Sequence, residues 1–131
     1  MTRSVRLFAT VAVVLAAGAV ATATAAAPAP ATMRVTLDIV AAGHDGVAEP
    51  ANFAVRAGGT VSLTVRNHTG LFHTFTIRAL GITLLVPPHR SVKTTFVAPY
   101  GVYNWRCVVC GTSGHPQMHR MGGRMYAIVN A

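Results

Sequence analysis

Residues 91–107 read SVKTTFVAPYGVYNWRC, which is the pattern of two short β-strands joined by a turn. The runs on either side of Pro99-Tyr100-Gly101 are rich in β-branched and aromatic residues, and the three residues between them are typical of turns. Side chains of a strand alternate between its two faces. Tyr103, Trp105 and Cys107 are therefore expected to share one face of a strand that ends at the cysteine.

The same pattern extends outward from this stretch through most of the chain. From Thr32 onward, short apolar runs are separated by Gly, Pro and Asn at intervals of roughly ten residues, and no long helical period occurs. Helix is expected at most as a turn within residues 41–50 or 117–122. We expect an all-β sandwich of about eight strands, at residues 34–40, 52–56, 60–66, 73–79, 82–86, 91–97, 101–107 and 124–130.

The first 27 residues have the composition of a secretion signal. Arg3 and Arg6 precede an apolar run over residues 7–20, and small residues follow, with cleavage expected after Ala25 or Ala26. An uncleaved membrane anchor is the alternative. Residues 28–33 then form a linker, and residues 34–131 form a single domain that is exported to the periplasm, the cell surface or the medium.

The chain is strongly basic, with eleven Lys and Arg residues against three acidic residues. Loss of Arg3 and Arg6 with the signal leaves nine against three, a net charge of +6. Such a charge indicates an acidic partner or an anionic surface, so association with a membrane surface is open. The arginines are spread singly, and no basic cluster follows a phosphate backbone, so we expect no nucleic acid as partner.

A second stretch, residues 107–118, reads CVVCGTSGHPQM and concentrates metal-binding side chains. Cys107, Cys110, His115 and Met118 form a soft set of sulfur and nitrogen donors, which selects copper among the metals that an exported protein meets. Methionine is a poor zinc ligand, so Met118 disfavours a structural zinc site. His73, at the start of a predicted strand, is the candidate for a further ligand.

These residues also have explanations without a metal. Two cysteines in an exported domain commonly form a disulfide, although a Cys107–Cys110 bridge closes a small loop and so stabilises less than one that closes a long loop. A thiol-redox role for the pair lacks the βαβ pattern that usually surrounds such a motif. His73 alone could be a hydrogen-bonded residue at the rim of the sandwich, and His44, His68 and His89 lie in predicted turns, where exposure is expected.

The order of these residues along the chain resembles that of the cupredoxin family. The resemblance rests on Phe72-His73-Thr74-Phe75 and on a later strand that ends in aromatic-x-Cys, with His115 and Met118 downstream. It covers residues 34–130 and implies a Greek-key, cupredoxin-like β-sandwich. It also implies a copper ion bound by His73, Cys107, His115 and a weak axial Met118. From its position after His73, Thr74 is expected to hydrogen-bond near the cysteine sulfur, and the two-residue period of the strand predicts Trp105 in the core or beside the site.

Two members of that family suggest different copper counts. The dinuclear site of cytochrome c oxidase subunit II has Cys-x3-Cys-x3-His-x2-Met, whereas this chain has Cys107-x2-Cys110-x4-His115-x2-Met118. The second cysteine is one place early, and Val108-Val109 replaces the acidic residue that usually lies between the cysteines. A mononuclear blue-copper site does not need Cys110. One copper ion is therefore favoured, and two remain open.

The function expected from the sequence is one-electron transfer by an exported, monomeric copper protein that is not an enzyme. Its partner would be an acidic redox protein, such as a cytochrome or a terminal oxidase. The alternatives are a dinuclear domain like that of oxidase subunit II and a copper delivery or buffering protein, for which Cys110, His119 and Met121 offer extra donors. A copper enzyme would need a second histidine cluster, and the chain has no His-x-His pair.

Overall fold

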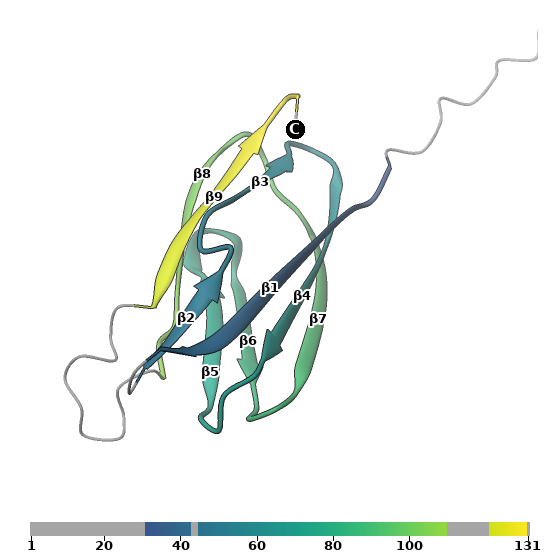
Figure 1. Ribbon diagram of the computed structural model, residues 1–131. Coiled ribbons are helices and arrows are strands. Elements are labelled where there is room, and N and C mark those ends of the chain that lie inside the picture. The colour runs from purple at the N-terminus through teal and green to yellow at the C-terminus, as the bar shows by residue number, and fades with distance from the viewer. Residues whose placement is uncertain (1–30, 43–44, 110–120, 131) are drawn as a thin grey trace, which may run out of the picture.

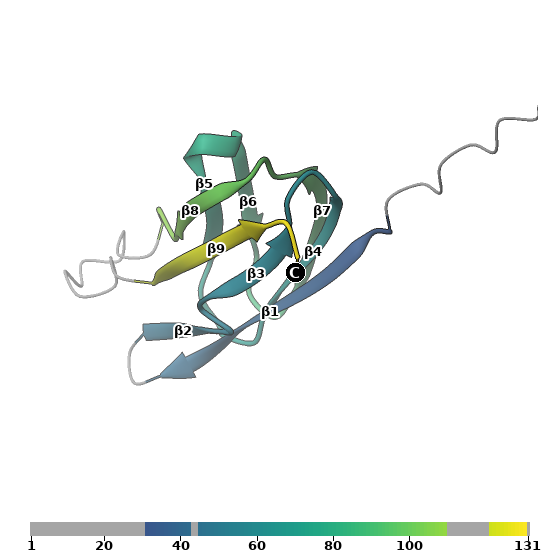
Figure 2. The same cartoon turned by 90° about the horizontal axis from the view of Figure 1, so that it is seen from above.

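The computed structural model describes residues 31–42, 45–109 and 121–130, and these residues form a two-layer β-sandwich (Figure 1). One sheet has four strands in the order β2-β1-β4-β7, and the other has five in the order β3-β9-β8-β5-β6. In Figure 2, β8 and β9 lie on one side of the molecule and β1 and β2 on the other. The strands are β1 (Met33–Ala42), β2 (Asp45–Glu49), β3 (Phe53–Arg56), β4 (Thr60–Asn67), β5 (His73–Ile77), β6 (Ile82–Val86), β7 (Ser91–Val97), β8 (Gly101–Arg106) and β9 (Gly122–Ile128).

The four-stranded sheet follows the alternation of its sequence. Along β4, Val61, Leu63 and Val65 are fully buried, while the residues between them face outward. β4 pairs in parallel with β1 and antiparallel with β7, so Leu63 lies opposite Val35 on one side and Thr94 on the other. Inward side chains from both sheets form one core, whose largest fully buried members are Phe75, Leu37, Ile39, Leu63, Ile77 and Met125.

The five-stranded sheet holds β5 in its interior. β5 pairs antiparallel with β6 along its whole length and with β8 through Thr76 and Arg106. All five residues of β5 are buried, including its three polar residues, and the strand lies between β8 and β6. β9 pairs antiparallel with β8 and in parallel with β3. These pairings place the first residue of β5 beside the chain that follows β8.

The described residues form nine strands rather than about eight. The additional strand, β2, occupies residues 45–49, where we predicted no strand. The segment has only Val47 and Ala48 as a short apolar run, and it becomes a strand because it pairs antiparallel with the edge of β1. Local composition could not reveal this pairing, which depends on a partner strand.

A second difference concerns the end of β5. We predicted a strand through Ala79, but β5 ends at Ile77 and a short 3-10 helix, η1 (Arg78–Leu80), follows. Gly81 ends this turn in the left-handed conformation, with φ 65°, which glycine adopts without a steric cost. Most of the other proposed helical turn, residues 117–122, lies outside the described residues.

The two ends of the sandwich are different in character. The His73 end comprises the turn between β4 and β5, the turn between β6 and β7, and the residues that follow β8. The Gly58 end comprises the start of β1, the turns after β3 and β7, and the end of β9, where Gly58 N donates to Ala98 O at 2.9 Å and Ala57 N to Ile128 O at 2.8 Å. In Figure 1 the His73 end is at the bottom and the Gly58 end at the top. Within the described ranges, no helix is long and apolar enough to span a bilayer.

Candidate metal centre

His73 and Cys107 meet at one end of the core, although 34 residues separate them in the sequence. The imidazole Nδ1 lies 4.0 Å from the cysteine Sγ. The two residues are only 3% and 4% exposed. His73 begins β5 and Cys107 follows β8, where its N–H donates to Met121 O at 2.9 Å and holds the backbone in place. The fold therefore buries an imidazole nitrogen beside a cysteine sulfur, and both are atom types that bind metals.

Thr74 directs two hydrogen-bond donors toward the cysteine sulfur. Its backbone N–H lies 3.3 Å from Sγ and its hydroxyl 3.8 Å from the same atom. The hydroxyl oxygen in turn accepts from Val108 N at 2.7 Å, which ties the chain after Cys107 to the start of β5. Donors aimed at a sulfur favour negative charge on it, so this environment suits a metal-bound thiolate.

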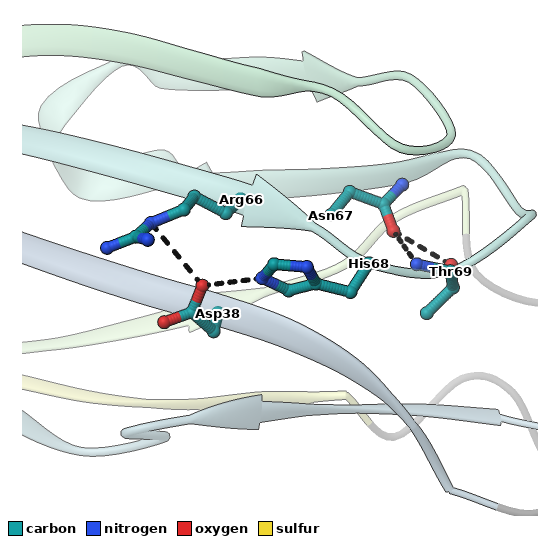
Figure 3. A network of polar contacts seen from close by, with 5 residues as sticks. All are labelled: Asp38, Arg66, Asn67, His68 and Thr69. Carbon is teal, nitrogen blue, oxygen red and sulfur yellow. Dashed lines mark hydrogen bonds and ion pairs between the residues drawn. The ribbon is translucent and has the colours of Figure 1, made fainter.

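A chain of hydrogen bonds through Asn67 and Thr69 orients the ring of His73. Thr69 Oγ1 lies 2.7 Å from His73 Nε2 and 2.8 Å from Asn67 Oδ1. Figure 3 shows the contacts between Asn67 and Thr69. The Asn67 amide orientation follows from its partners: Nδ2 donates to the carbonyls of Leu71 and Pro87 at 2.7 and 3.0 Å, while Oδ1 accepts from Thr69 N at 2.9 Å.

This chain assigns the tautomer of His73. A hydroxyl has one hydrogen and an amide oxygen can only accept, so the 2.8 Å contact between Thr69 Oγ1 and Asn67 Oδ1 requires that hydrogen to lie between these two oxygens. Thr69 Oγ1 must then accept from His73, so Nε2 carries the ring proton. Nδ1, the nitrogen nearer Sγ, therefore presents its lone pair, as a metal ligand must.

Burial also affects the protonation of His73. Its pKa is lowered from 6.5 because desolvation of the ring disfavours the charged form. The neutral ring is the form that binds metals. Burial keeps the ring neutral, and the hydrogen bond to Thr69 leaves Nδ1 without a proton, so both effects favour metal binding at Nδ1.

Gly46 of β2 is a further residue of the site that the sequence did not suggest. A Cβ at this position would lie 3.0 Å from Ile39 Cγ2 and 3.2 Å from His73 Cε1. The added strand β2 therefore packs its backbone against the imidazole. Asn67 and Thr69 were also missed as site residues: Asn67-His68-Thr69-Gly70 gave only a turn signal, because the contact with His73 is visible only in three dimensions.

The remaining predicted ligands cannot be placed. Cys110, His115 and Met118 lie outside the described residues. Of the predicted ligand set, the structure brings together His73 and Cys107, and the described part of the chain contains no group of three or more His, Cys, Asp or Glu residues able to hold a metal. Cys107 is in a disulfide in this structure, and Cys110 is the only other cysteine of the sequence.

The distance between His73 Nδ1 and Cys107 Sγ tests whether copper suits the site. Metal–nitrogen and metal–sulfur bonds of about 2.0–2.3 Å place two ligands of one ion a little under 4 Å apart, and Nδ1 and Sγ are 4.0 Å apart. The donor types, a neutral imidazole and a sulfur with hydrogen-bond donors around it, suit copper. The described part of the site therefore fits this metal once the cysteine is a thiolate.

The contacts of Trp105 and His68 are with protein groups outside the His73–Cys107 pair. Trp105 is 2% exposed, stacks on Phe75 with ring centroids 5.0 Å apart, and donates from Nε1 to Ala51 O at 2.8 Å. It belongs to the core beneath the site. His68 is exposed, and its Nε2 lies 2.8 Å from Asp38 Oδ1, which Arg66 also approaches (Figure 3).

Comparison with known proteins gives structural likenesses only. No protein-family model matches the sequence, and no curated protein matches it. Auracyanin A, a "blue" copper protein from Chloroflexus aurantiacus, superimposes with a TM-score of 0.57 at 16% identity, over 74% of this chain and 99% of that one. The chain has the cupredoxin fold.

Two other proteins with this fold illustrate its range. The metal binding domain of the Streptococcus pneumoniae Cu(I) exporting P-type ATPase CopA has a TM-score of 0.57 at 13% identity, over 73% of this chain and 85% of that one. The periplasmic domain of subunit II of cytochrome oxidase from Bradyrhizobium japonicum has a TM-score of 0.51 at 20% identity, over 60% of this chain and 55% of that one. The predicted cupredoxin-like sandwich is confirmed.

Proposed function

We propose that this protein is an exported electron carrier that holds one copper ion with His73, Cys107, His115 and Met118. The observation that carries the proposal is the buried pair at the His73 end, where Nδ1 and Sγ lie 4.0 Å apart on two different strands. The likeness to Auracyanin A, described as a "blue" copper protein, supports it. The protein would not itself be an enzyme.

Each described residue has a defined task in this proposal. When bound, copper supplies one-electron redox chemistry. Cys107 provides the strong thiolate bond, His73 provides Nδ1, and Thr74 donates to the sulfur and so tunes its electron density. Thr69 and Asn67 keep the His73 ring in one orientation. A ligand set held this firmly changes little between oxidation states.

The disulfide at Cys107 must be opened before copper binds. Only a thiolate is a strong ligand, so an external dithiol must first reduce the bond by thiol–disulfide exchange, in which the protein gains two thiols and the dithiol becomes a disulfide. Loss of the thiol protons then accompanies metal binding. We therefore propose that the reduced protein is the copper-binding form.

Apolar side chains beside the site offer a contact for the redox partner. Leu71 and Phe72 precede His73 and are 41% and 56% exposed, and Val108 follows Cys107 and is 44% exposed. Removal of these groups from water would favour close approach of a partner to the buried pair. The excess of basic residues suits an acidic partner, such as a cytochrome or a terminal oxidase. We propose that the carrier itself is monomeric.

Optical and EPR spectra of the reduced protein loaded with copper test the proposal. We expect an intense visible thiolate-to-copper band and a four-line hyperfine pattern, which reports one ion. A seven-line pattern would instead report a mixed-valence pair that includes Cys110. Cys107→Ser should abolish the visible band, and the proposal fails if this variant binds copper with unchanged spectra.

Copper delivery is the second candidate function, favoured by the likeness to the CopA metal binding domain, whose structure contains Cu(I). A delivery protein would bind Cu(I) tightly and pass it to a chelator or acceptor without changing its oxidation state. Reversible one-electron titration of the loaded protein, together with a stable coloured Cu(II) form, would exclude this alternative.

A further inference from the structure

Exposed apolar side chains gather at the Gly58 end, far from His73 and Cys107. The members of this Gly58-end surface are Val97, Tyr100, Val102, Ile128 and Val129, which are 54%, 74%, 61%, 39% and 68% exposed. β8 and β9 pair with Val102 opposite Tyr126 and Gly101 opposite Ala127. Continuing this register places Tyr100 opposite Ile128 on the outward face, and Arg56 of β3 lies beside Ile128 on the other side.

The outward face of the four-stranded sheet carries mainly polar side chains, as expected for a face in contact with water. In β4 the outward residues are Thr60, Ser62, Thr64 and Arg66, and in β7 they are Ser91, Lys93 and Thr95, with Val97 the exception at the Gly58 end. A sheet face in contact with water is usually polar in this way. The Gly58 end departs from that pattern, because exposed apolar side chains from the ends of β7, β8 and β9 and from the adjoining turns lie there, and such a group marks a contact with something other than water.

The distribution of charged residues indicates which kind of partner the Gly58-end surface contacts. All three acidic residues of the sequence belong to β2 and to the second half of β1, which runs toward the His73 end. Arg34, near the start of β1, and Arg56, at the end of β3, lie at the Gly58 end, and both are exposed. A surface that combines apolar groups, tyrosine and arginine without acidic residues complements an anionic lipid bilayer.

The N-terminal segment joins the domain at the same end. Residues 31–33 line a shallow hollow together with Arg56. The chain before them carries the apolar run at residues 7–20, joined through ten residues, 21–30. Ten residues reach at most about 35 Å when extended. If the run stays in a bilayer, this short connection keeps the Gly58 end close to the lipid surface.

We propose that the Gly58-end surface lies on an anionic lipid bilayer, so that the His73 end points into the aqueous phase. Tyr100 and Val102 enter the interface, and Arg34 and Arg56 face the anionic headgroups. The inference does not depend on copper binding, because it uses no residue of the metal centre. It explains why opposite ends of one small sandwich are both apolar: one faces a redox partner and the other faces lipid.

Tryptophan reporters in the full-length protein test this orientation. Tyr100→Trp and Val102→Trp place an indole in the surface, and Leu85→Trp is the matched control, because Leu85 is 53% exposed but lies opposite Thr74 toward the His73 end. The native Trp105 is 2% exposed and gives a constant background. Each protein is mixed with vesicles of phosphatidylglycerol and phosphatidylcholine, with and without brominated acyl chains.

We expect the emission of Trp at positions 100 and 102 to shift to the blue and to be quenched by the brominated lipid, with little change at position 85. In the Tyr100→Trp protein, Arg34→Gln should raise the anionic lipid concentration needed for half-maximal quenching about five-fold, the effect of one cation near such a surface. Equal quenching at all three positions, or none at positions 100 and 102, overturns the proposal. A blue shift that grows with protein concentration without vesicles would also overturn it, by showing a contact between two copies.

Discussion

At the scale of single residues, the metal centre depends on how the ring of His73 is held. Asn67 orients the Thr69 hydroxyl, and that hydroxyl orients the imidazole. Each member is buried, with exposures of 2%, 7% and 3% for Asn67, Thr69 and His73. A missing partner in such a chain leaves a buried polar group without a hydrogen bond, which costs more than the bond itself contributes.

Thr69→Val should therefore weaken both the fold and the metal site. The change keeps the side-chain shape but removes the acceptor of the Nε2 proton, so we expect a loss of about 1–3 kcal/mol in the free energy of unfolding and a loss of about 10–100-fold in copper affinity. Denaturant unfolding and copper titration measure these effects, and nitrogen NMR of the ring reports the tautomer. Thr69→Ser is the control and should retain both properties. An unchanged Nε2–H tautomer in Thr69→Val would contradict the proposed role.

The lowered pKa of His73 predicts a pH dependence of stability. Above pH 6.5 the ring is neutral in both folded and unfolded chains and contributes no dependence. As the pH falls below 6.5, the unfolded chain takes up a proton that the folded protein resists, so the free energy of unfolding decreases until the pH passes the lowered pKa. Unfolding of the metal-free protein across this window measures the effect. His73→Gln should remove this component, whereas His68→Gln should leave it in place.

At the scale of elements, β2 completes the wall of the site. It was absent from the strands expected from sequence, and its strand conformation depends on pairing with β1. Through Gly46 it brings backbone against the imidazole with no space for a side chain. β5 contributes both His73 and Thr74 from consecutive positions, so the strand supplies a ligand and the donor to the sulfur.

Gly46→Ala should disturb the site without breaking the sandwich. The new methyl would meet Ile39 and His73 at 3.0 and 3.2 Å, and we expect overpacking to cost about 1–3 kcal/mol and to shift the NMR signals of the His73 ring. Thermal unfolding and NMR measure these changes. Gly59→Ala is the matched control, because its Cβ would have ordinary contacts of 3.5 Å or more. Equal effects of both substitutions would show that Gly46 has no special relation to His73.

At the scale of the whole molecule, the two ends of the sandwich divide the proposed tasks. The His73 end carries the buried donor atoms and the exposed Leu71 and Phe72, while the Gly58 end carries Tyr100 and Val102. The core between them includes Phe75 and Trp105, which stack on one another beneath the site. A carrier bound to lipid through one end would present the other to partners in the aqueous phase.

Copper binding should stabilise the whole reduced domain, because the metal joins β5 to the chain that follows β8. Free copper at a hundred times the dissociation constant adds about 2.7 kcal/mol, which raises Tm by about 11–22 °C in a domain of this size. Calorimetry of the reduced protein with and without copper measures the shift, and a chelator should reverse it. Cys107→Ser is the control. A shift of the same size in that variant would show that copper stabilises the protein elsewhere.

The sequence by itself determined the features that depend on neighbouring residues. Short runs of β-branched and aromatic residues between turn residues predicted eight of the nine described strands, among them β4. The residue types and order of His73 and Cys107 suggested a copper site, because donor chemistry belongs to each side chain. Tertiary structure alone decided the rest: β2 is a strand only through β1, Gly46 meets His73 only across the sandwich, and Thr69 orients His73 only after a turn brings them together. These features arise from pairings between segments that approach one another only when the hydrophobic core forms, so local composition carries no signal for them.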